Sequence, residues 1–143
     1  MKVYLAGPLF TTPERDFNAL LATRLRTDGH EVFLPHEHPP ADLTGEAILR
    51  KDLKGLDWAE CVVAVMDGPD PDSGTSWECG YAYARNKPVV LFRSDLRRSG
   101  DTADAPYNAM LIGAADVHIE LPVGSVDDAA DAIDRALTRL TDR

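Results

Sequence analysis

The chain has 143 residues, a length that fits one domain with its own core, and we predict a single domain over residues 1–143. Its residues are 44% hydrophobic and 27% charged, as in globular proteins, and no apolar run approaches the roughly 20 residues that span a membrane. The formal net charge of −9 repels a phosphate backbone, so we exclude DNA and RNA polymers as expected partners, but not a small ligand.

Strand-like and helix-like patterns alternate along the chain. KVYLA at residues 2–6 predicts a buried strand ending at Gly7, and Thr12-Pro13-Glu14 then predicts the start of a helix that Gly29 ends. The same patterns predict four more strands, at 31–34, 61–66, 88–92 and 116–121, and four more helices, at 43–58, around Glu78, at 107–113 and from Ser125. In the helix at 43–58, four apolar residues share one side: Ile48, Leu49, Leu53 and Leu56.

Five strands that alternate with helices indicate the α/β class, because parallel strands need helical crossovers. We predict an open, doubly wound five-stranded parallel sheet, flavodoxin-like or Rossmann-like, with strand order 2-1-3-4-5. Ligands bind such sheets beyond the carboxyl ends of the strands, near the point where the strand order reverses. The predicted cleft therefore contains the segment AGPLF, the segment DGPDPDSGTSWE and the loop after the fourth strand.

The N-terminal segment and the two cysteines give two further predictions. The first residues, MKVYLAGPLF, offer too short an apolar stretch for a signal peptide, so we expect a cytoplasmic location. Cys61 and Cys79 have no CxxC spacing, and we expect both to be buried free thiols.

The loop after the third strand is rich in carboxylates, at Asp67, Asp70 and Asp72, and contains no Lys or Arg. The chain has neither GxxxxGK nor GxGxxG, so we expect no nucleoside triphosphate and no dinucleotide cofactor. His36 and His38 leave a metal site open as an alternative. A proline-bearing loop of this kind is more often a solvated turn, and we expect no metal.

Glu78 has two interpretations that spacing alone leaves open. Thr75 and Glu78 have the spacing of a capping box, in which both residues only begin a helix. Alternatively, two carboxylates in unequal environments can cleave a glycosidic bond, one as the nucleophile and one as the acid. In the first turn of a helix Glu78 would be kept ionised by the positive helix end, and Asp72 could approach it. Asp52, between two lysines, is by itself typical of an exposed helix face.

Several motifs, taken together and in order, are similar to those of the nucleoside 2-deoxyribosyltransferase family. A Tyr in a strand before small residues, an Asp-Leu-x-Gly segment, an Asp-x-Gly-x-x-x-Glu-x-Gly-Tyr-Ala signature and an Asn-x-Met segment all have counterparts here. The matching segments are VYLAGPLF at 3–10, DLKGL at 52–56, DSGTSWECGYA at 72–82, KPVVL at 87–91 and YNAMLIGAAD at 107–116.

The resemblance implies a role for each matching residue. Glu78 would be the nucleophile at C1′, and Tyr4 would orient its carboxylate. Asp52 would handle the proton on the nucleobase. Asp72 would bind the sugar 5′-hydroxyl, and Asn108 would reach the same hydroxyl from a neighbouring subunit. The protein would then be a homo-oligomer, a dimer or an assembly of dimers, with shared active sites.

Four further substrate-binding candidates lie in the same motifs: Gly7, Phe10, Gly74 and Trp77. Leu9, Phe10 and Trp77 are the apolar candidates for stacking on a base. Their residue types alone favour the core for each of them, because aromatic residues at helix starts often pack onto the sheet.

The resemblance implies a glycosyltransferase that passes a 2-deoxyribosyl group between nucleobases in purine and pyrimidine salvage. A 2′-deoxynucleoside and a nucleobase would be its partners, without a cofactor, and water as the acceptor would give hydrolysis. The related 2′-deoxynucleoside 5′-monophosphate N-glycosidases are the alternative. Asp72 argues against them because it repels phosphate, whereas NAMLIGAAD resembles both groups. A non-catalytic nucleoside-binding module is the second alternative.

Overall fold

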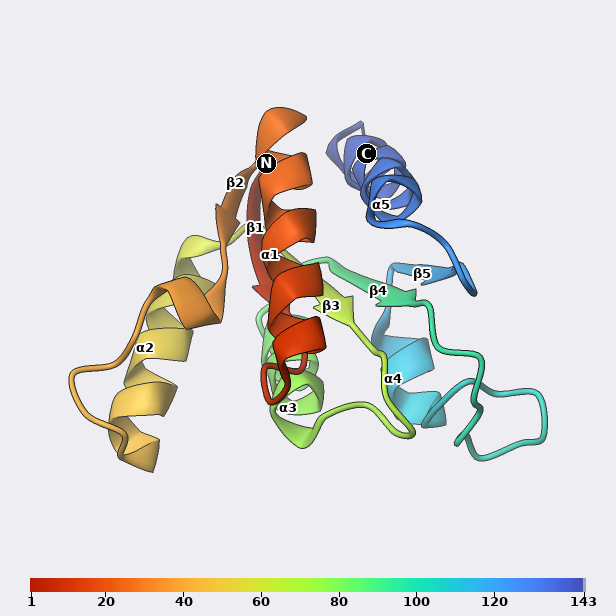
Figure 1. Ribbon diagram of the computed structural model, residues 1–143, viewed down its shortest axis with the longest axis horizontal. Helices are drawn as coiled ribbons and strands as arrows, with labels where there is room; N and C mark the ends of the chain where they lie inside the picture. Colours follow the sequence, from red (N-terminus) through yellow and green to blue (C-terminus); the bar gives the residue numbers. More distant parts are fainter. Residues whose placement is uncertain (143) are drawn as a thin grey trace.

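The computed structural model describes residues 1–142 and contains one five-stranded parallel sheet with the order β2-β1-β3-β4-β5 (Figure 1). The predicted α/β class and strand order are therefore confirmed. The strands are β1 (Lys2–Ala6), β2 (Glu31–Phe33), β3 (Cys61–Val65), β4 (Val89–Arg93) and β5 (Val117–Glu120). The helices are α1 (Thr12–Thr27), α2 (Gly45–Trp58), α3 (Ser73–Ala84), α4 (Ala109–Ala114) and α5 (Val126–Thr141), with a short 3₁₀ turn, η1 (Pro35–Glu37).

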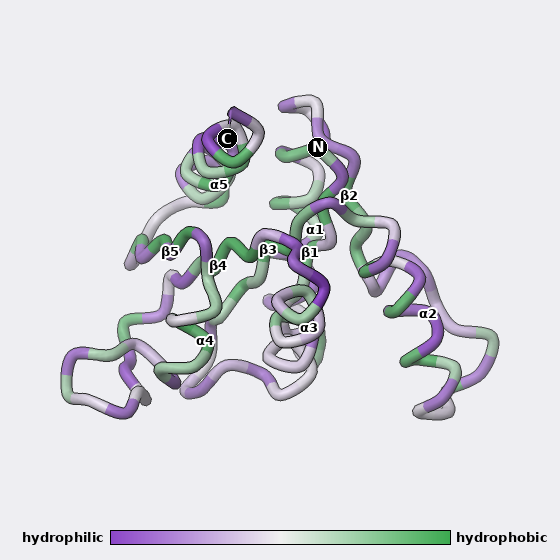
Figure 2. The backbone as a smooth tube through the Cα atoms, turned by 180° about the vertical axis from the view of Figure 1, so that it is seen from behind, coloured by the Kyte–Doolittle hydropathy of each residue, from purple (hydrophilic) through white to green (hydrophobic). Residues whose placement is uncertain are grey.

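Helices cover both faces of the sheet. Helices α1 and α5 pack on one face, and α2, α3 and α4 lie on the other. Strands β3 and β4 are buried along their whole length, and Figure 2 shows them as hydrophobic segments inside the molecule. Burial on both faces explains why they read as continuous apolar runs rather than as alternating patterns.

The start of α3 differs from the prediction. Its N-cap is Asp72, whose Oδ2 accepts hydrogen bonds from the backbone N (2.9 Å) and the Oγ1 (3.1 Å) of Thr75. Thr75 is therefore a buried residue inside the helix, and the predicted capping box of Thr75 and Glu78 is wrong. Either Asp or Thr can cap a helix, so residue type and spacing do not distinguish Asp72 from Thr75.

The apolar side predicted for α2 is only partly buried. Leu56 is fully buried, but Ile48 and Leu49 are 39% and 44% exposed. The first half of α2 extends beyond the edge of the sheet (Figure 1), so these side chains have little of the sheet to pack against. None of the helices within residues 1–142 is long and apolar enough to cross a membrane.

Both cysteines are buried free thiols, as predicted. Burial raises the pKa of the Cys61 thiol and of the Cys79 thiol to about 12, so both stay protonated at neutral pH.

Lys87 ties the C-terminal end of α2 to the start of β4. Its ammonium donates to three backbone carbonyls, those of Leu56 (2.6 Å), Asp57 (2.9 Å) and Ala59 (2.6 Å). We expect Lys87→Met to lower the free energy of unfolding by about 2 kcal/mol, because carbonyls at a helix end lose a charged donor. Urea unfolding measures this, with Lys54→Met, an exposed lysine of the same helix, as the control. Equal stability of the two variants would contradict the assigned role.

Candidate active site

A buried phenol and a carboxylate meet on the face of the sheet that α2 and α3 cover. Tyr4, in β1, is fully buried, and its hydroxyl donates to Oε1 of Glu78 at 2.5 Å. Glu78 comes from α3 and is half-buried. The carboxylate of Asp52, from α2, also acts on this phenol. Three predicted site residues that are far apart in the sequence thus lie together.

Burial is the largest of the causes that raise the pKa of Tyr4, and the charges and hydrogen bonds of Glu78 and Asp52 raise it further. The phenol therefore stays protonated at every accessible pH and acts as a permanent hydrogen-bond donor. This fixes which oxygen of Glu78 is held and leaves the carboxylate in one orientation.

Burial also raises the pKa of Glu78, to about 7. The hydrogen bond from Tyr4 and the charge of Lys51 lower it, whereas the charges of Asp52 and Asp72 raise it. The prediction that the helix end would keep Glu78 ionised is wrong. Glu78 is the sixth residue of α3, beyond the first turn, where the positive helix end has little effect and burial dominates.

Asp72 and Gly74 stand at the start of α3. One carboxylate oxygen of Asp72 is held by Thr75, and its charge reaches Glu78. A Cβ at Gly74 would lie 3.1 Å from that oxygen of Asp72, so a larger residue would crowd the cap. Asp72 is thus near Glu78 and orders the loop that precedes it.

Phe10 and Trp77, two of the stacking candidates, do not lie in the core as their residue types suggested. Phe10 is 73% exposed and Trp77 50% exposed, and Leu9 is half-buried. Trp77 stacks on Tyr81 one helical turn later, with ring centroids 5.5 Å apart, because it lies on the outer side of α3. The aromatic rings are therefore open to a ligand or a partner chain.

Gly7 permits a close approach at the end of β1. A Cβ there would meet the amide of Asn18 at 3.1 Å and the Cβ of Val65 at 3.2 Å. Asn18 is buried and donates from Nδ2 to the carbonyl of Pro8 at 2.9 Å. Gly7 thereby lets α1 hold the turn that follows the strand.

Two residues that the sequence analysis did not select support Tyr4. The ring of Phe33 stacks on Tyr4, with centroids 5.5 Å apart and an interplanar angle of 11°. A Cβ at Gly55 would lie 2.5 Å from this ring, so the glycine of DLKGL allows Phe33 to pack between α2 and Tyr4. A glycine inside a helical pattern was the available signal for such an approach.

The acidic loop after β3 is anchored from within the chain. Asp67 accepts hydrogen bonds from the backbone N and the Oγ of Ser94, both at 2.6 Å. The buried guanidinium of Arg93 donates to the carbonyls of Met66, Gly68 and Arg97. These contacts join the loops after β3 and β4, so Asp67 serves the loop itself.

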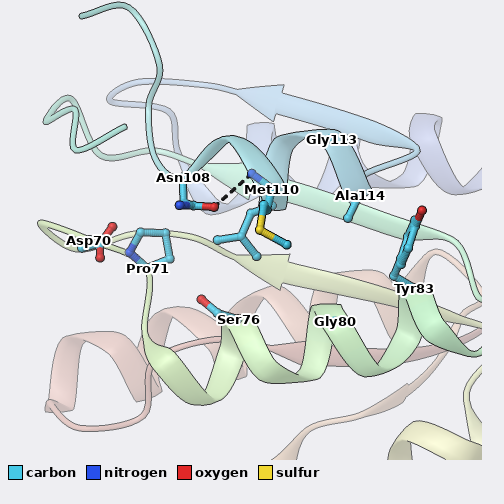
Figure 3. Close-up of a pocket in the computed structure, with 10 residues that line it drawn as sticks. Asp70, Pro71, Ser76, Gly80, Tyr83, Asn108, Met110, Gly113 and Ala114 are labelled. Carbon is cyan, nitrogen blue, oxygen red and sulfur yellow. Dashed lines mark hydrogen bonds between the residues drawn. The ribbon is translucent and has the colours of Figure 1, made fainter. Parts of the chain in front are cut away.

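Asn108 lies away from Glu78 within one chain. It is the N-cap of α4, where its Oδ1 accepts from the backbone N of Met110 at 2.9 Å (Figure 3). It lines an apolar groove of about 620 Å³ between α3 and α4, together with Ser76 and Gly80. Because residues two apart on a helix point to nearly opposite sides, Glu78 faces away from this groove.

The two histidines considered as metal ligands do not form a cluster. His38 stacks on Phe33, with centroids 4.2 Å apart. Within residues 1–142, no three His, Cys, Asp or Glu side chains are grouped so that they could hold a metal ion.

The doubly wound sheet and the buried Tyr–Glu pair beside a second carboxylate define an α/β protein with a carboxylate-based site. The chain belongs to the nucleoside 2-deoxyribosyltransferase family, because the family model of that description matches residues 3–110. Deoxyribosyltransferases and N-glycosidases make up this family of enzymes. No curated protein matches the chain.

Solved structures resemble the chain over nearly its whole length. A conserved protein from Enterococcus faecalis V583 is 26% identical to this chain, with a TM-score of 0.76. The match covers 95% of this chain and 98% of that protein. The 2-deoxyribosyltransferase of Bacillus psychrosaccharolyticus is also 26% identical, with a TM-score of 0.71, and the match covers 92% of this chain and 91% of that enzyme. The CMP N-glycosidase BcmB of Clostridium botulinum is 18% identical and shares the fold, with a TM-score of 0.65. The match covers 94% of this chain and 99% of that enzyme.

Proposed function

We propose that this protein transfers the 2-deoxyribosyl group of a 2′-deoxynucleoside to another nucleobase through a covalent ester on Glu78. The hydrogen bond between Tyr4 and Glu78 supports this proposal most strongly. A structural carboxylate does not need a fully buried phenol to fix it beside a second acid, whereas a nucleophile that must meet one carbon atom does.

In the first half-reaction an ionised oxygen of Glu78 attacks C1′ from the face opposite the base. The C1′–N bond breaks, and its electron pair leaves with the base. Asp52 passes a proton from solvent to the departing nitrogen, so that the base leaves neutral. The negative charge of Glu78 stabilises the positive charge that develops on the sugar, and no metal or cofactor is needed.

In the second half-reaction the incoming base attacks C1′ and the ester bond to Glu78 breaks. The electron pair returns to the carboxylate, and Asp52 takes the proton that the attacking nitrogen loses. Water can take the place of the base, which gives free deoxyribose and thus hydrolysis. Exchange between bases suits a role in nucleotide salvage.

We assign a free nucleoside, rather than a 5′-monophosphate, as the substrate. Helix N-termini are the usual binding places for phosphate, but the start of α3 is occupied by the carboxylate of Asp72. This carboxylate would repel a phosphate dianion and can instead accept a hydrogen bond from a 5′-hydroxyl.

We further propose a homo-oligomer in which Asn108 completes the site of a partner chain. Asn108 cannot serve the Glu78 of its own chain, which faces the other way. The groove beside Asn108 has exposed apolar side chains, Met110 (83%) and Tyr83 (62%), and small residues at Gly80 and Gly113 that leave room for a second copy.

Incubation with deoxyinosine and adenine, followed by chromatography, tests the function. New deoxyadenosine is the expected product. Free hypoxanthine and deoxyribose without transfer would identify a hydrolase, and no turnover would leave a nucleoside-binding module. Faster cleavage of deoxynucleoside 5′-monophosphates than of nucleosides would contradict the role given to Asp72.

Removing the Tyr4 hydroxyl should slow the reaction most at low pH. Because the hydrogen bond from Tyr4 lowers the pKa of Glu78, Tyr4→Phe should move the rising limb of kcat/KM above its expected midpoint near pH 7. We expect kcat/KM at pH 7 to fall about 10- to 100-fold, the usual effect of losing a hydrogen bond to a charged group. A pH series measures this, with Tyr81→Phe, which bonds the exposed Asp57, as the control. If the rising limb of the kcat/KM profile were unchanged in Tyr4→Phe, Tyr4 would not be the residue that orients Glu78.

A further inference from the structure

Lys51 lies inside the cluster of acids, although neither the motifs nor the proposed mechanism uses it. Its Nζ donates to the carbonyl of Pro35 at 3.2 Å and lies 2.9 Å from Oδ1 of Asp52, an ion pair whose angles do not make a hydrogen bond. Its side chain is 18% exposed and that of Asp52 16%. The ammonium is therefore largely enclosed between α2 and η1.

This arrangement is not what a helix produces by default. Neighbouring residues on a helix point about 100° apart and do not face each other. Lys51 and Asp52 nevertheless converge, and the same ammonium donates to the carbonyl of Pro35 in η1. Lys54, three residues further on the same helix, stays exposed. The position of Lys51 is thus set by tertiary contacts.

The groups that act on Glu78 come from three elements. From β1 Tyr4 donates a hydrogen bond, and from α3 the carboxylate of Asp72 and the protonated thiol of Cys79 lie near. From α2 come Asp52 and Lys51. Two carboxylates thus oppose the ionisation of Glu78, and among the groups that act on it Lys51 supplies the positive charge.

We propose that Lys51 is a positioning residue that holds Asp52 against η1 and adds a positive charge to the cluster of acids around Glu78. The inference rests on the proposed function for its catalytic consequence, but the charge effect on Glu78 exists without substrate. Without Lys51, Glu78 would face Asp52 and Asp72 with only the hydrogen bond from Tyr4 to favour its ionised form.

A carboxyl titration by ¹³C NMR tests the proposal directly. The Glu78 signal is assigned by its disappearance in Glu78→Gln. Two neutral variants are used: Lys51→Gln, which keeps a donor for Pro35, and Lys51→Met. We expect the Glu78 midpoint to rise by about one pH unit in both, because Lys51 lowers the pKa of Glu78 and the loss of an opposite charge near a carboxyl typically shifts its pKa by about that amount.

Two controls separate the charge from the fold. Lys51→Arg keeps the charge and should keep the wild-type midpoint. Lys54→Met removes an equal charge from the exposed part of α2 and should leave the midpoint unchanged. An unchanged midpoint in the neutral Lys51 variants, or an equal rise in Lys54→Met, overturns the proposal.

The same variants give a kinetic result if the wild-type protein turns over nucleosides. A rise of about one unit from pH 7 leaves about one tenth of Glu78 ionised at pH 7, so kcat/KM should fall about fivefold there and recover at pH 9. A loss that is equal at both pH values would contradict the charge effect. Absence of turnover in the wild-type protein would refute the proposed function and leave the titration result standing.

Discussion

Replacing Glu78 with Gln should abolish deoxyribosyl transfer and, at the same time, stabilise the fold above pH 7. Gln keeps the size of Glu and an oxygen that accepts from Tyr4, but it cannot attack C1′ and leave again as a carboxylate. We expect kcat to fall about a thousandfold or more, the usual cost of losing a nucleophile.

The gain in stability follows from the raised pKa of Glu78. Its folded value of about 7 exceeds the ordinary 4.5, so the unfolded chain releases this proton more readily, and ionisation destabilises the folded state. The loss in the free energy of unfolding is absent below pH 4.5 and grows as the pH rises from 4.5 to 7. Above pH 7 it levels off at about 3 kcal/mol at most. Glu78→Gln removes this loss.

Urea unfolding at pH 4 and pH 8 measures the difference. The variant should be more stable than the wild type at pH 8 and of equal stability at pH 4. If Glu78→Gln were less stable than the wild type at pH 8, the charged carboxylate of Glu78 would not destabilise the folded state. Glu31→Gln, at an exposed glutamate, should change neither stability nor turnover.

Two inactive variants should restore activity to each other if the active site is shared. Glu78→Gln lacks the nucleophile, and Asn108→Ser lacks the amide but keeps a side chain able to cap α4. In a one-to-one mixture half of the dimers are mixed, and each contains one site with both Glu78 and Asn108 intact. We expect about one quarter of the wild-type rate after the subunits exchange.

The mixing experiment has two controls. Each variant alone should stay inactive, and Met110→Asp, which places a charge in the groove, should give a monomer in analytical ultracentrifugation and prevent the recovery. No recovery from two variants that still form dimers would mean that Asn108 serves its own chain or no site.

The sequence was sufficient for the sheet and its order because each strand carries its own apolar run between helical patterns. Glu78 was a candidate nucleophile from its residue type and position, but Tyr4 and Asp52 came only from the resemblance, since nothing local links them to Glu78. The cap of α3 was misplaced because Asp72 and Thr75 both have the spacing of a helix start. Local patterns rank such residues equally, and the packing of the helix decides between them.

Properties that depend on the surroundings of a side chain could not be predicted. The raised pKa of Glu78 comes from the burial of its side chain in the fold, which the sequence of α3 does not reveal. In the sequence Lys51 is one of two lysines on a helix, and only the structure shows its contact with the carbonyl of Pro35. The exposure of Trp77 depends on which side of α3 meets the sheet, and that of Phe10 depends on the path of the loop after β1.

Trapping the covalent intermediate tests most directly whether Glu78 carries the sugar. The protein is mixed with deoxyinosine without an acceptor base, quenched in acid within milliseconds and digested, and the peptides are analysed by mass spectrometry. We predict one added deoxyribosyl residue, on Glu78, that disappears when adenine is present before the quench. An adduct on another residue, or turnover that continues in Glu78→Gln, would contradict the mechanism.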